Sequence, residues 1–370
     1  PAYEWDFSDV NPPVHAWSTF RVFKIDEKIK GKPDLAFLES VFQKLLLNFT
    51  WWVNRKDKNG NNVFGGGFLG LDNIGAFDRN TQFQNGEYLE QADGTSWMAM
   101  FALNMMRIAM ELALYNPVYE DMAIKFFEHY LYIAEAMESL GEDKNGLWNE
   151  EDGFFYDVLQ LNDGTGISLK LRSIVGLIPM FAVEVVEHDM LEKMPKFKAR
   201  MDWILKNKEE LANLVSHWEV EGKGRKHLMS ILRKNRLTKI LNRMLDEKEF
   251  LSEFGIRSMS KTYEEKPFQL EINGINHVGH YTPAESDSRM FGGNSNWRGP
   301  IWFPINFLIV ESLQRFHFYY DNSLKVELPT GSGNFKNLGE ISENLSRRLS
   351  NIFLKNDEGK RAFNGNVDKF

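Results

Sequence analysis

The sequence predicts an all-α fold in which helical hairpins pack side by side and gather their loops at one end. Apolar residues recur at helical spacing through long segments. Pairs of these segments alternate with loops rich in Gly, Asn, Asp and Trp, at a repeat of roughly 60 to 80 residues that is too loose for a solenoid. A closed α/α toroid satisfies this pattern, and an open helical array is the alternative. No linker rich in Pro, Gly or Ser divides the chain, so we expect one domain over residues 1–370.

Helix caps and apolar faces place the individual elements. Asp34 is expected to cap a helix over 35–49, whose apolar residues share one face. Ser96 is expected to cap a helix over 97–115, which Pro117 closes off. The other helices are predicted at 118–140, 168–186, 196–206, 209–215, 226–245, 300–320 and 337–354, and short strands at 153–159 and 268–272.

Composition excludes several classes of function. The net charge of −8 argues against nucleic acid as a partner, because nucleic-acid binding needs a basic surface. The absence of cysteine rules out disulfides, thiolate zinc sites and a cysteine nucleophile. The histidines lack metal-ligand spacing, so we expect no zinc site and no cofactor. No EF-hand pattern is present and no metal ligand is assigned, although the loops rich in Asp and Asn leave calcium binding open. No apolar run reaches membrane-spanning length and no signal peptide is visible, so we expect a cytoplasmic protein without a membrane partner.

The densest group of polar and aromatic residues lies at 294–302, just before the apolar segment 303–313. It contains the indoles of Trp297 and Trp302, the guanidinium of Arg298 and the amide of Asn296. Indoles offer flat apolar faces, and guanidinium and amide groups offer directional hydrogen bonds. A sugar ring has an apolar face and a rim of hydroxyls, so this group predicts a carbohydrate site.

A glycine-rich segment at 65–79 contains the strongest candidate acid. Asp72 lies within an otherwise apolar run, where partial loss of solvent raises the pKa of a carboxyl group and suits it to act as a general acid. The structural alternative is that Asp72 caps a turn or pairs with Arg79, which is the more common role of Asp in such loops.

Five further sites in the sequence have residues suited to a sugar cleft. The segment 3–17 contains Trp5, Asp6, Asn11 and Trp17, although a capped helix entry explains it equally well. Arg172 opens an apolar helix and, if buried, needs a carboxylate or a ligand as partner. The remaining candidates are Gln91, Asp93 and Trp97 at a helix N-terminus, Tyr156 and Asp157 beside a turn, and Glu285 as an isolated acid.

Three motifs in this order resemble glycoside hydrolase family 63, which includes processing α-glucosidase I and bacterial mannosylglycerate hydrolase-type enzymes. They are the segment 3–17, the Gly-Leu-Asp-Asn at 70–73 and the Asn-Trp-Arg-Gly-Pro-Ile-Trp at 296–302. The resemblance implies an (α/α)6 barrel and an inverting α-glycosidase that acts on an oligosaccharide or small glycoside. It maps the family's general acid onto Asp72.

Inversion also needs a second carboxylate, which activates a water molecule. The two carboxyl groups stand ~6.5–9.5 Å apart to leave room for that water. No Glu between 337 and 370 matches the family's general base. We therefore expect the base beyond Phe370, in the remainder of a longer polypeptide, with Glu285 as the candidate within the chain and the barrel incomplete at its C-terminal end. The residues assigned to substrate binding are Trp5, Asp6, Asn11, Trp17, Phe68, Asn73, Arg79, Gln91, Asp93, Trp97, Tyr156, Asp157, Arg172, Asn296, Trp297, Arg298 and Trp302.

Two other functions remain open from the sequence. A non-catalytic carbohydrate-binding or scaffold protein would keep the aromatic pocket without the base. Another (α/α)6 activity, such as a polysaccharide lyase or a sugar epimerase, would act on a similar substrate without hydrolysis.

Overall fold

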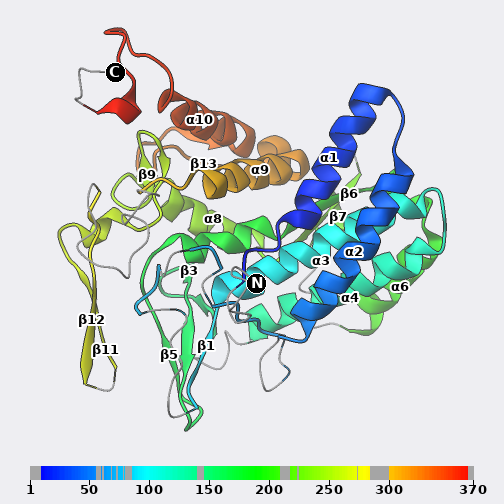
Figure 1. Cartoon of the computed structure of the whole chain (residues 1–370), viewed down its shortest axis with the longest axis horizontal. Helices are drawn as coiled ribbons and strands as arrows, with labels where there is room; N and C mark the ends of the chain where they lie inside the picture. The colour runs from blue at the N-terminus through cyan, green and yellow to red at the C-terminus, as the bar shows by residue number, and fades with distance from the viewer. Residues whose placement is uncertain are drawn as a thin grey trace. The chain divides into compact units, whose positions relative to one another are not determined.

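Figure 1 shows a computed structural model of the whole chain. It describes residues 10–55, 60, 62–67, 69–71, 74–77, 79, 86–139, 146–208, 217–222, 225–272, 274–283 and 300–365. The chain divides into two compact units. Unit 1 comprises residues 1–70, 80–170 and 178–233, and unit 2 comprises residues 71–79, 171–177 and 234–370.

Four long helices form the body of unit 1. They are α1 (His15–Lys30), α2 (Leu35–Val53), α3 (Ala92–Ala113) and α4 (Tyr119–Ser139), and they pack against one another (Figure 1). Asp34 caps α2 as predicted, because its side chain accepts a hydrogen bond from the backbone N–H of Phe37. Phe49 of α2 joins the packed helices, with ring centroids 5.1 Å from Phe101 and 4.8 Å from Phe126.

Helix α3 is the centre of this unit. Every residue of α3 except Arg107 is buried, and a helix that is buried all round forms the core of its domain. Its polar residues therefore need partners from neighbouring elements or from the backbone of the helix itself. Glu111 receives the ammonium of Lys24 on α1 at 2.7 Å, and Ser96 donates to the carbonyl of Ala92 at 2.5 Å.

Short strands and helices complete unit 1. The first sheet joins β1 (Tyr88–Glu90), β4 (Val158–Gln160) and β5 (Gly166–Ser168) in the order β1-β4-β5, with antiparallel neighbours. A second antiparallel sheet has the order β6-β8-β7, with Val183 opposite Ser230. The other elements are β2 (Trp148–Asn149), β3 (Phe154–Phe155), β6 (Val183–Glu187), β7 (His217–Gly222), β8 (Lys226–Ser230), α5 (His188–Glu192) and α6 (Pro195–Asn207).

Unit 2 contains three α-helices and three hairpins within its described residues. Helix α9 (Phe303–Tyr320) packs against α10 (Leu338–Asn351), whose first turn is closed by a capping box between Asn337 and Glu340. The 3-10 helix η1 (Ile174–Phe181) begins in unit 2 and ends in unit 1. The other elements are α8 (Lys234–Met244), β9 (Leu251–Ser252), β10 (Gly255–Ile256), β11 (Phe268–Ile272), β12 (Ile275–Gly279), β13 (Lys325–Glu327), β14 (Phe335–Asn337), η2 (Lys261–Tyr263), η4 (Asp321–Ser323) and η5 (Ala362–Asn364).

The prediction of a mainly helical chain is confirmed in part. Six small sheets lie among the described residues, so a purely all-α fold is not confirmed. Two predicted helices are wrong: residues 168–186 form η1 and strand β6, and the first part of 226–245 is strand β8. Ser96 is also not a helix cap, since α3 already begins at Ala92. The predicted helix at 209–215 lies outside the described residues, and closure of a toroid stays a prediction.

His15 at the start of α1 should make the stability of unit 1 depend on pH. Burial lowers the pKa of its imidazole below the ordinary value of 6.5, and a polar contact with Asn48 offsets this only partly. The folded protein therefore binds fewer protons at His15 than the unfolded chain. The free energy of unfolding should be highest above pH 6.5 and fall as the pH drops through the lowered pKa.

Urea unfolding of the wild type and of His15→Gln between pH 5 and 8 measures this dependence. His15→Gln should reduce the fall in the free energy of unfolding below pH 6.5. The control substitution His277→Gln in unit 2 should leave this fall unchanged. An equal acid loss in the wild type and in His15→Gln would show that another group titrates.

Candidate functional site

The predicted site residues divide into those that the structure describes and those that it does not. Outside the described residues lie Trp5, Asp6, Phe68, Asp72, Asn73, Glu285, Asn296, Trp297 and Arg298. The described ones are Asn11, Trp17, Gln91, Asp93, Trp97, Tyr156 and Asp157 in unit 1, and Arg79, Arg172 and Trp302 in unit 2.

Gln91 holds the glycine-rich loop that leads towards Asp72 in the sequence. Its Oε1 accepts hydrogen bonds from the backbone N–H groups of Gly66 at 2.6 Å and Gly67 at 3.1 Å. Its Nε2 donates to the carbonyl of Gly67 at 2.8 Å. The side chain is 2% exposed. Three bonds to backbone occupy most of the hydrogen-bonding capacity of one amide, so the geometry favours a positioning role for Gln91 over direct contact with a sugar.

The N-terminus of α3 is fixed by a residue from far along the chain. Asp157 is 8% exposed, and its Oδ1 accepts a hydrogen bond from the backbone N–H of Ala92 at 2.8 Å. A carboxylate at this position satisfies an open donor of the first turn and complements the helix dipole. Asp93 is fully buried in the same turn and accepts from the N–H of Gly94. The residues predicted at this helix end are therefore brought together, with Asp157 serving as its anchor.

Close packing at this helix end leaves no room for a side chain at residue 94. A Cβ added to Gly94 would lie 2.5 Å from the carbonyl oxygen of Phe64. The backbone N–H of Phe64 is in turn bound by the hydroxyl of Thr95 at 3.1 Å. The backbone before the glycine-rich loop thus lies directly on α3, and the Gln91 bonds extend the same attachment.

The aromatic candidates of unit 1 differ in exposure. Trp97 is fully buried with its ring centroid 5.4 Å from that of Phe181. Its indole N–H has no hydrogen-bond partner among the described residues. Tyr156 is also buried, and its hydroxyl donates to Asp152 at 3.3 Å. Trp17 is half-buried and Asn11 is exposed. A substrate-binding role for these side chains stays a prediction.

In unit 2, Arg172 is held by three neighbours. The backbone N–H of Arg172 donates to the hydroxyl of Tyr263 at 2.8 Å, and its carbonyl accepts from the N–H of Ser260 at 3.0 Å. Its guanidinium lies 3.5 Å from Oε1 of Glu249, an oxygen that also receives Arg243 at 2.5 Å. Glu249 is 7% exposed, so its charge is stabilised mainly by these two arginines. The expected carboxylate partner of Arg172 is therefore Glu249.

The described end of the Trp-Arg motif is attached to the same stretch of backbone. The N–H of Ser258 donates to the carbonyl of Pro300 at 2.9 Å, and Arg257 forms a β-bridge with Ile301. On its other side, Ser258 accepts from the N–H of Ile174 at 2.7 Å. Residues 256–260 thus form a central strand-like segment between Arg172 and Trp302, which are 130 positions apart in sequence.

Asn306 fixes the start of α9 on this central segment. Its Oδ1 accepts from the N–H of Ile256 at 2.7 Å, and its Nδ2 donates to the carbonyls of Ile256 and Trp302, each at 3.0 Å. Gly255 has a φ of +129°, and a Cβ there would lie 2.9 Å from Oδ1 of Asn306. Glycine and asparagine are therefore both required for the helix to meet the strand.

Arg79 also belongs to unit 2 and is buried, at 6% exposure. Nearby in this segment, the ring of Phe77 lies 5.6 Å from that of His277 on β12. Phe77 therefore packs against the β12 hairpin of the same unit.

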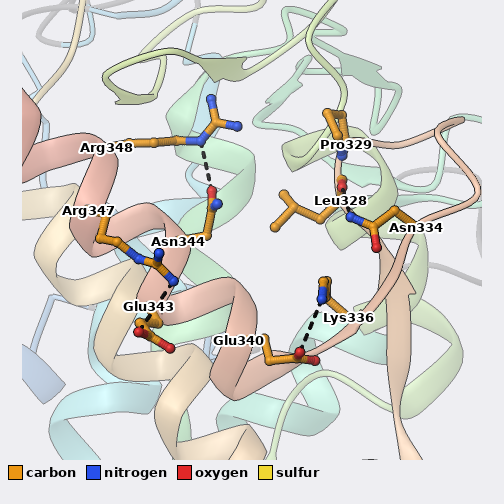
Figure 2. A pocket seen from close by; sticks show the side chains of 9 residues that line it. All are labelled: Leu328, Pro329, Asn334, Lys336, Glu340, Glu343, Asn344, Arg347 and Arg348. Atoms are coloured by element: carbon orange, nitrogen blue, oxygen red, sulfur yellow. Dashed lines mark hydrogen bonds and ion pairs between the residues drawn. The ribbon is translucent and has the colours of Figure 1, made fainter.

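A separate pocket of about 340 Å³ lies between α10 and residues 328–336 (Figure 2). Its charged walls are paired without a ligand: Lys336 with Glu340 at 3.2 Å and Arg347 with Glu343 at 3.3 Å. None of its lining residues is aromatic or belongs to the predicted site. Within the described part of the chain, no group of three or more His, Asp or Glu side chains is arranged to hold a metal ion.

Comparison with known proteins finds a family match over part of the chain. Residues 226–356 match the family model for the "Glycosyl hydrolase family 63 C-terminal domain". The match spans β8 to α10, and the resemblance to this family inferred from the motifs is confirmed. None of the described helices has the length and apolarity needed to cross a bilayer.

One relative matches over the full chain. The chain is 52% identical to "Uncharacterized protein YMR196W" of Saccharomyces cerevisiae over 383 aligned residues, which cover 100% of this chain and 35% of the yeast protein. The chain thus spans about a third of the length of this relative.

Two solved structures from Thermus thermophilus are more distant, each with 14% identity. An uncharacterized conserved protein has a TM-score of 0.45, with 93% of this chain and 78% of that chain covered. A family 63 mannosylglycerate hydrolase in complex with glucose has a TM-score of 0.42, with 93% and 76% covered. The similarity to family 63 therefore rests on the sequence match to residues 226–356.

Sequence reasoning did not identify Glu249, Asn306 or Ser258. Glu249 lies in a charged run, 246–249, where an acid normally faces solvent. A structural role for Asn306 could have been predicted from the sequence more easily, because an Asn within an apolar helix must find a hydrogen-bond partner when it is buried.

Proposed function

We propose that this chain is the catalytic part of an inverting glycoside hydrolase that cleaves an α-glucosidic or α-mannosidic bond. The observation that carries the proposal is the family 63 match over residues 226–356, together with the preceding Gly-Leu-Asp-Asn motif at 70–73. In this proposal residues 1–370 belong to one (α/α)6 domain, and the substrate is an oligosaccharide or small glycoside.

Asp72 acts as the general acid and protonates the leaving glycosidic oxygen. A second carboxylate activates water on the opposite face of the sugar, so the product is released as the β-anomer. Glu285 is the candidate base within the chain. Gln91 supports this chemistry because it fixes the backbone of Gly66 and Gly67, a few residues before Asp72.

Asp72→Asn should lower kcat by about 10²–10⁴-fold on ordinary glycosides, the range that a general acid contributes. Proton NMR with a panel of α-glucosides and α-mannosides, including glucosylglycerate and mannosylglycerate, measures both turnover and the anomer released. Asp202→Asn, an exposed aspartate of α6, is the matched control and should retain full activity.

Glycosyl fluorides separate loss of the acid from loss of the fold. Fluoride leaves without protonation, so Asp72→Asn should still hydrolyse an α-glycosyl fluoride at a rate near that of the wild type. Equal loss on both substrate types would contradict the assigned role. Glu285→Gln in the same assay tests where the base lies: turnover falls on both the glycoside and the fluoride if Glu285 is the base, and is retained if the base lies beyond Phe370.

The two alternative functions give different results in this assay. A carbohydrate-binding protein would bind the sugars without releasing product, and a lyase would form an unsaturated product that absorbs in the ultraviolet. Either result, or release of the α-anomer, would replace inverting hydrolysis as the function.

A further inference from the structure

Helix α9 has an apolar face on each side. Its inner face is formed by Ile309, Leu313 and Phe316, which are fully buried. Its outer face contains Phe303, Phe307, Gln314 and Phe318, whose spacing of 4, 7 and 4 residues places them in one row along the helix. The three phenylalanines of this row are 42%, 50% and 45% exposed.

The row continues onto residues that follow α10. The ring of Phe353 lies 5.8 Å from that of Phe303 and 6.1 Å from that of Phe363. Phe353, Leu354 and Phe363 are 54%, 59% and 59% exposed. We define the aromatic stripe as Phe303, Phe307, Phe318, Phe353, Leu354 and Phe363.

The stripe is large for a surface in contact with water. A phenylalanine ring buries about 200 Å² in full, so five half-exposed rings present on the order of 500 Å². Apolar patches of this size on a soluble protein generally mark an interaction surface. The ring planes of Phe303 and Phe353 are inclined by 68°, and those of Phe353 and Phe363 by 45°. They form no flat platform for a sugar chain, which favours a protein partner with side chains that fill the gaps.

The shape of the stripe specifies the kind of partner. From Phe303 to Phe318 the row spans about 22 Å at 1.5 Å per residue. A second α-helix of about four turns, with an apolar face, matches this length and packs its side chains into the spaces between the phenylalanines.

The length of the yeast relative indicates where this helix comes from. This chain aligns from end to end at 52% identity with only 35% of that protein. About two thirds of the relative therefore lies outside the aligned part, and any segment of that remainder is covalently tethered to the aligned part. A tethered segment meets the stripe at a high effective concentration, which a separate partner lacks.

We propose that the aromatic stripe is the docking surface for an amphipathic helix of the same, longer polypeptide, from outside these 370 residues. This assignment does not depend on the proposed hydrolase activity, because it concerns only how unit 2 is covered.

Photo-crosslinking in the natural full-length polypeptide tests the proposal. p-Benzoylphenylalanine is placed at position 307 or 318, and the cross-linked peptides are identified by mass spectrometry. Mixing ¹⁵N-labelled and unlabelled protein distinguishes bonds within one polypeptide from bonds between two copies. Both positions should cross-link, within one polypeptide, to a peptide from outside these 370 residues. The matched control is position 275, where Ile275 of the β12 hairpin is 61% exposed, and it should give no such product.

Three results would overturn the proposal. Mixed-label products would show that a second copy occupies the stripe. Products confined to these 370 residues would show that the chain covers the stripe itself, and the absence of any product would show that the stripe faces solvent.

The 370-residue chain alone gives a second measurement. Phe307→Ser/Phe318→Ser should reduce its binding of a fluorescent apolar dye several-fold, measured at a temperature where both proteins remain folded. If sedimentation instead shows a wild-type dimer that this variant abolishes, the stripe is a self-association surface.

Discussion

Replacing Gln91 by leucine is expected to lower the free energy of unfolding by about 2–5 kcal/mol. Leucine fills nearly the same volume but leaves the N–H groups of Gly66 and Gly67, and the carbonyl of Gly67, without the side-chain partner seen here. Each buried polar group left without a partner costs about 1–3 kcal/mol. Gly67 is half-buried, so water offsets part of the loss and the total stays below the full sum.

The same substitution should affect catalysis beyond its effect on stability, if Asp72 is the general acid. A misplacement of about 1 Å in a catalytic group can reduce the rate about 10²-fold. Urea unfolding and kcat measured at a temperature where the variant remains folded separate the two effects. Gln269→Leu, on the exposed side of β11, is the control. Wild-type stability in Gln91→Leu would show that the loop does not depend on this side chain.

Replacing Glu249 by alanine should destabilise unit 2 by about 2–4 kcal/mol. The change leaves the guanidinium groups of Arg172 and Arg243 without their shared carboxylate. Breaking a fully buried ion pair costs about 3–5 kcal/mol. The two arginine side chains are 27% and 21% exposed, so solvent screening lowers this figure.

A double-mutant cycle isolates the contribution of the pair. Glu249→Ala should cost less in an Arg172→Ala background by a coupling energy of about 0.5–3 kcal/mol, and the cost that remains includes the loss of the Arg243 contact. Glu249→Gln keeps a neutral oxygen acceptor at the same position and should be milder than Glu249→Ala. Strictly additive effects of Glu249→Ala and Arg172→Ala would mean that the 3.5 Å contact contributes nothing.

The helices that were predicted correctly are those whose signals, a capping residue or an apolar face, lie within the helical segment itself. The helix after Asp34 and the helix at 300–320 have an apolar face that is buried within their own unit. The error at 168–186 has a local reason, since Pro179 and Gly176 disfavour an α-helix and Val183, Val185 and Val186 favour a strand. The strand at 226–230 depends instead on pairing with β6, 40 positions earlier, and helical periodicity over a basic segment concealed it.

The candidate site was predictable as a set of residue types but not as a set of contacts. The need of Arg172 for a carboxylate follows from its apolar context, yet Glu249 is 77 positions away and nothing local distinguishes it from its acidic neighbours. Gln91 and Asp157 were predicted to face a sugar. Their described bonds instead go to backbone, because helix ends and glycine loops need partners that sequence spacing does not reveal.

The central segment 256–260 also bears on how this protein tolerates changes in length. It pairs with residues around Arg172 on one side and around Pro300 on the other, so inserting a single residue would shift both registers at once and reverse the faces of its side chains. The β11–β12 hairpin, only eight positions further on, turns at Gly274 with open space around it. Insertions and deletions should therefore be tolerated in that hairpin, whereas the length of the segment 256–260 should stay fixed at five residues.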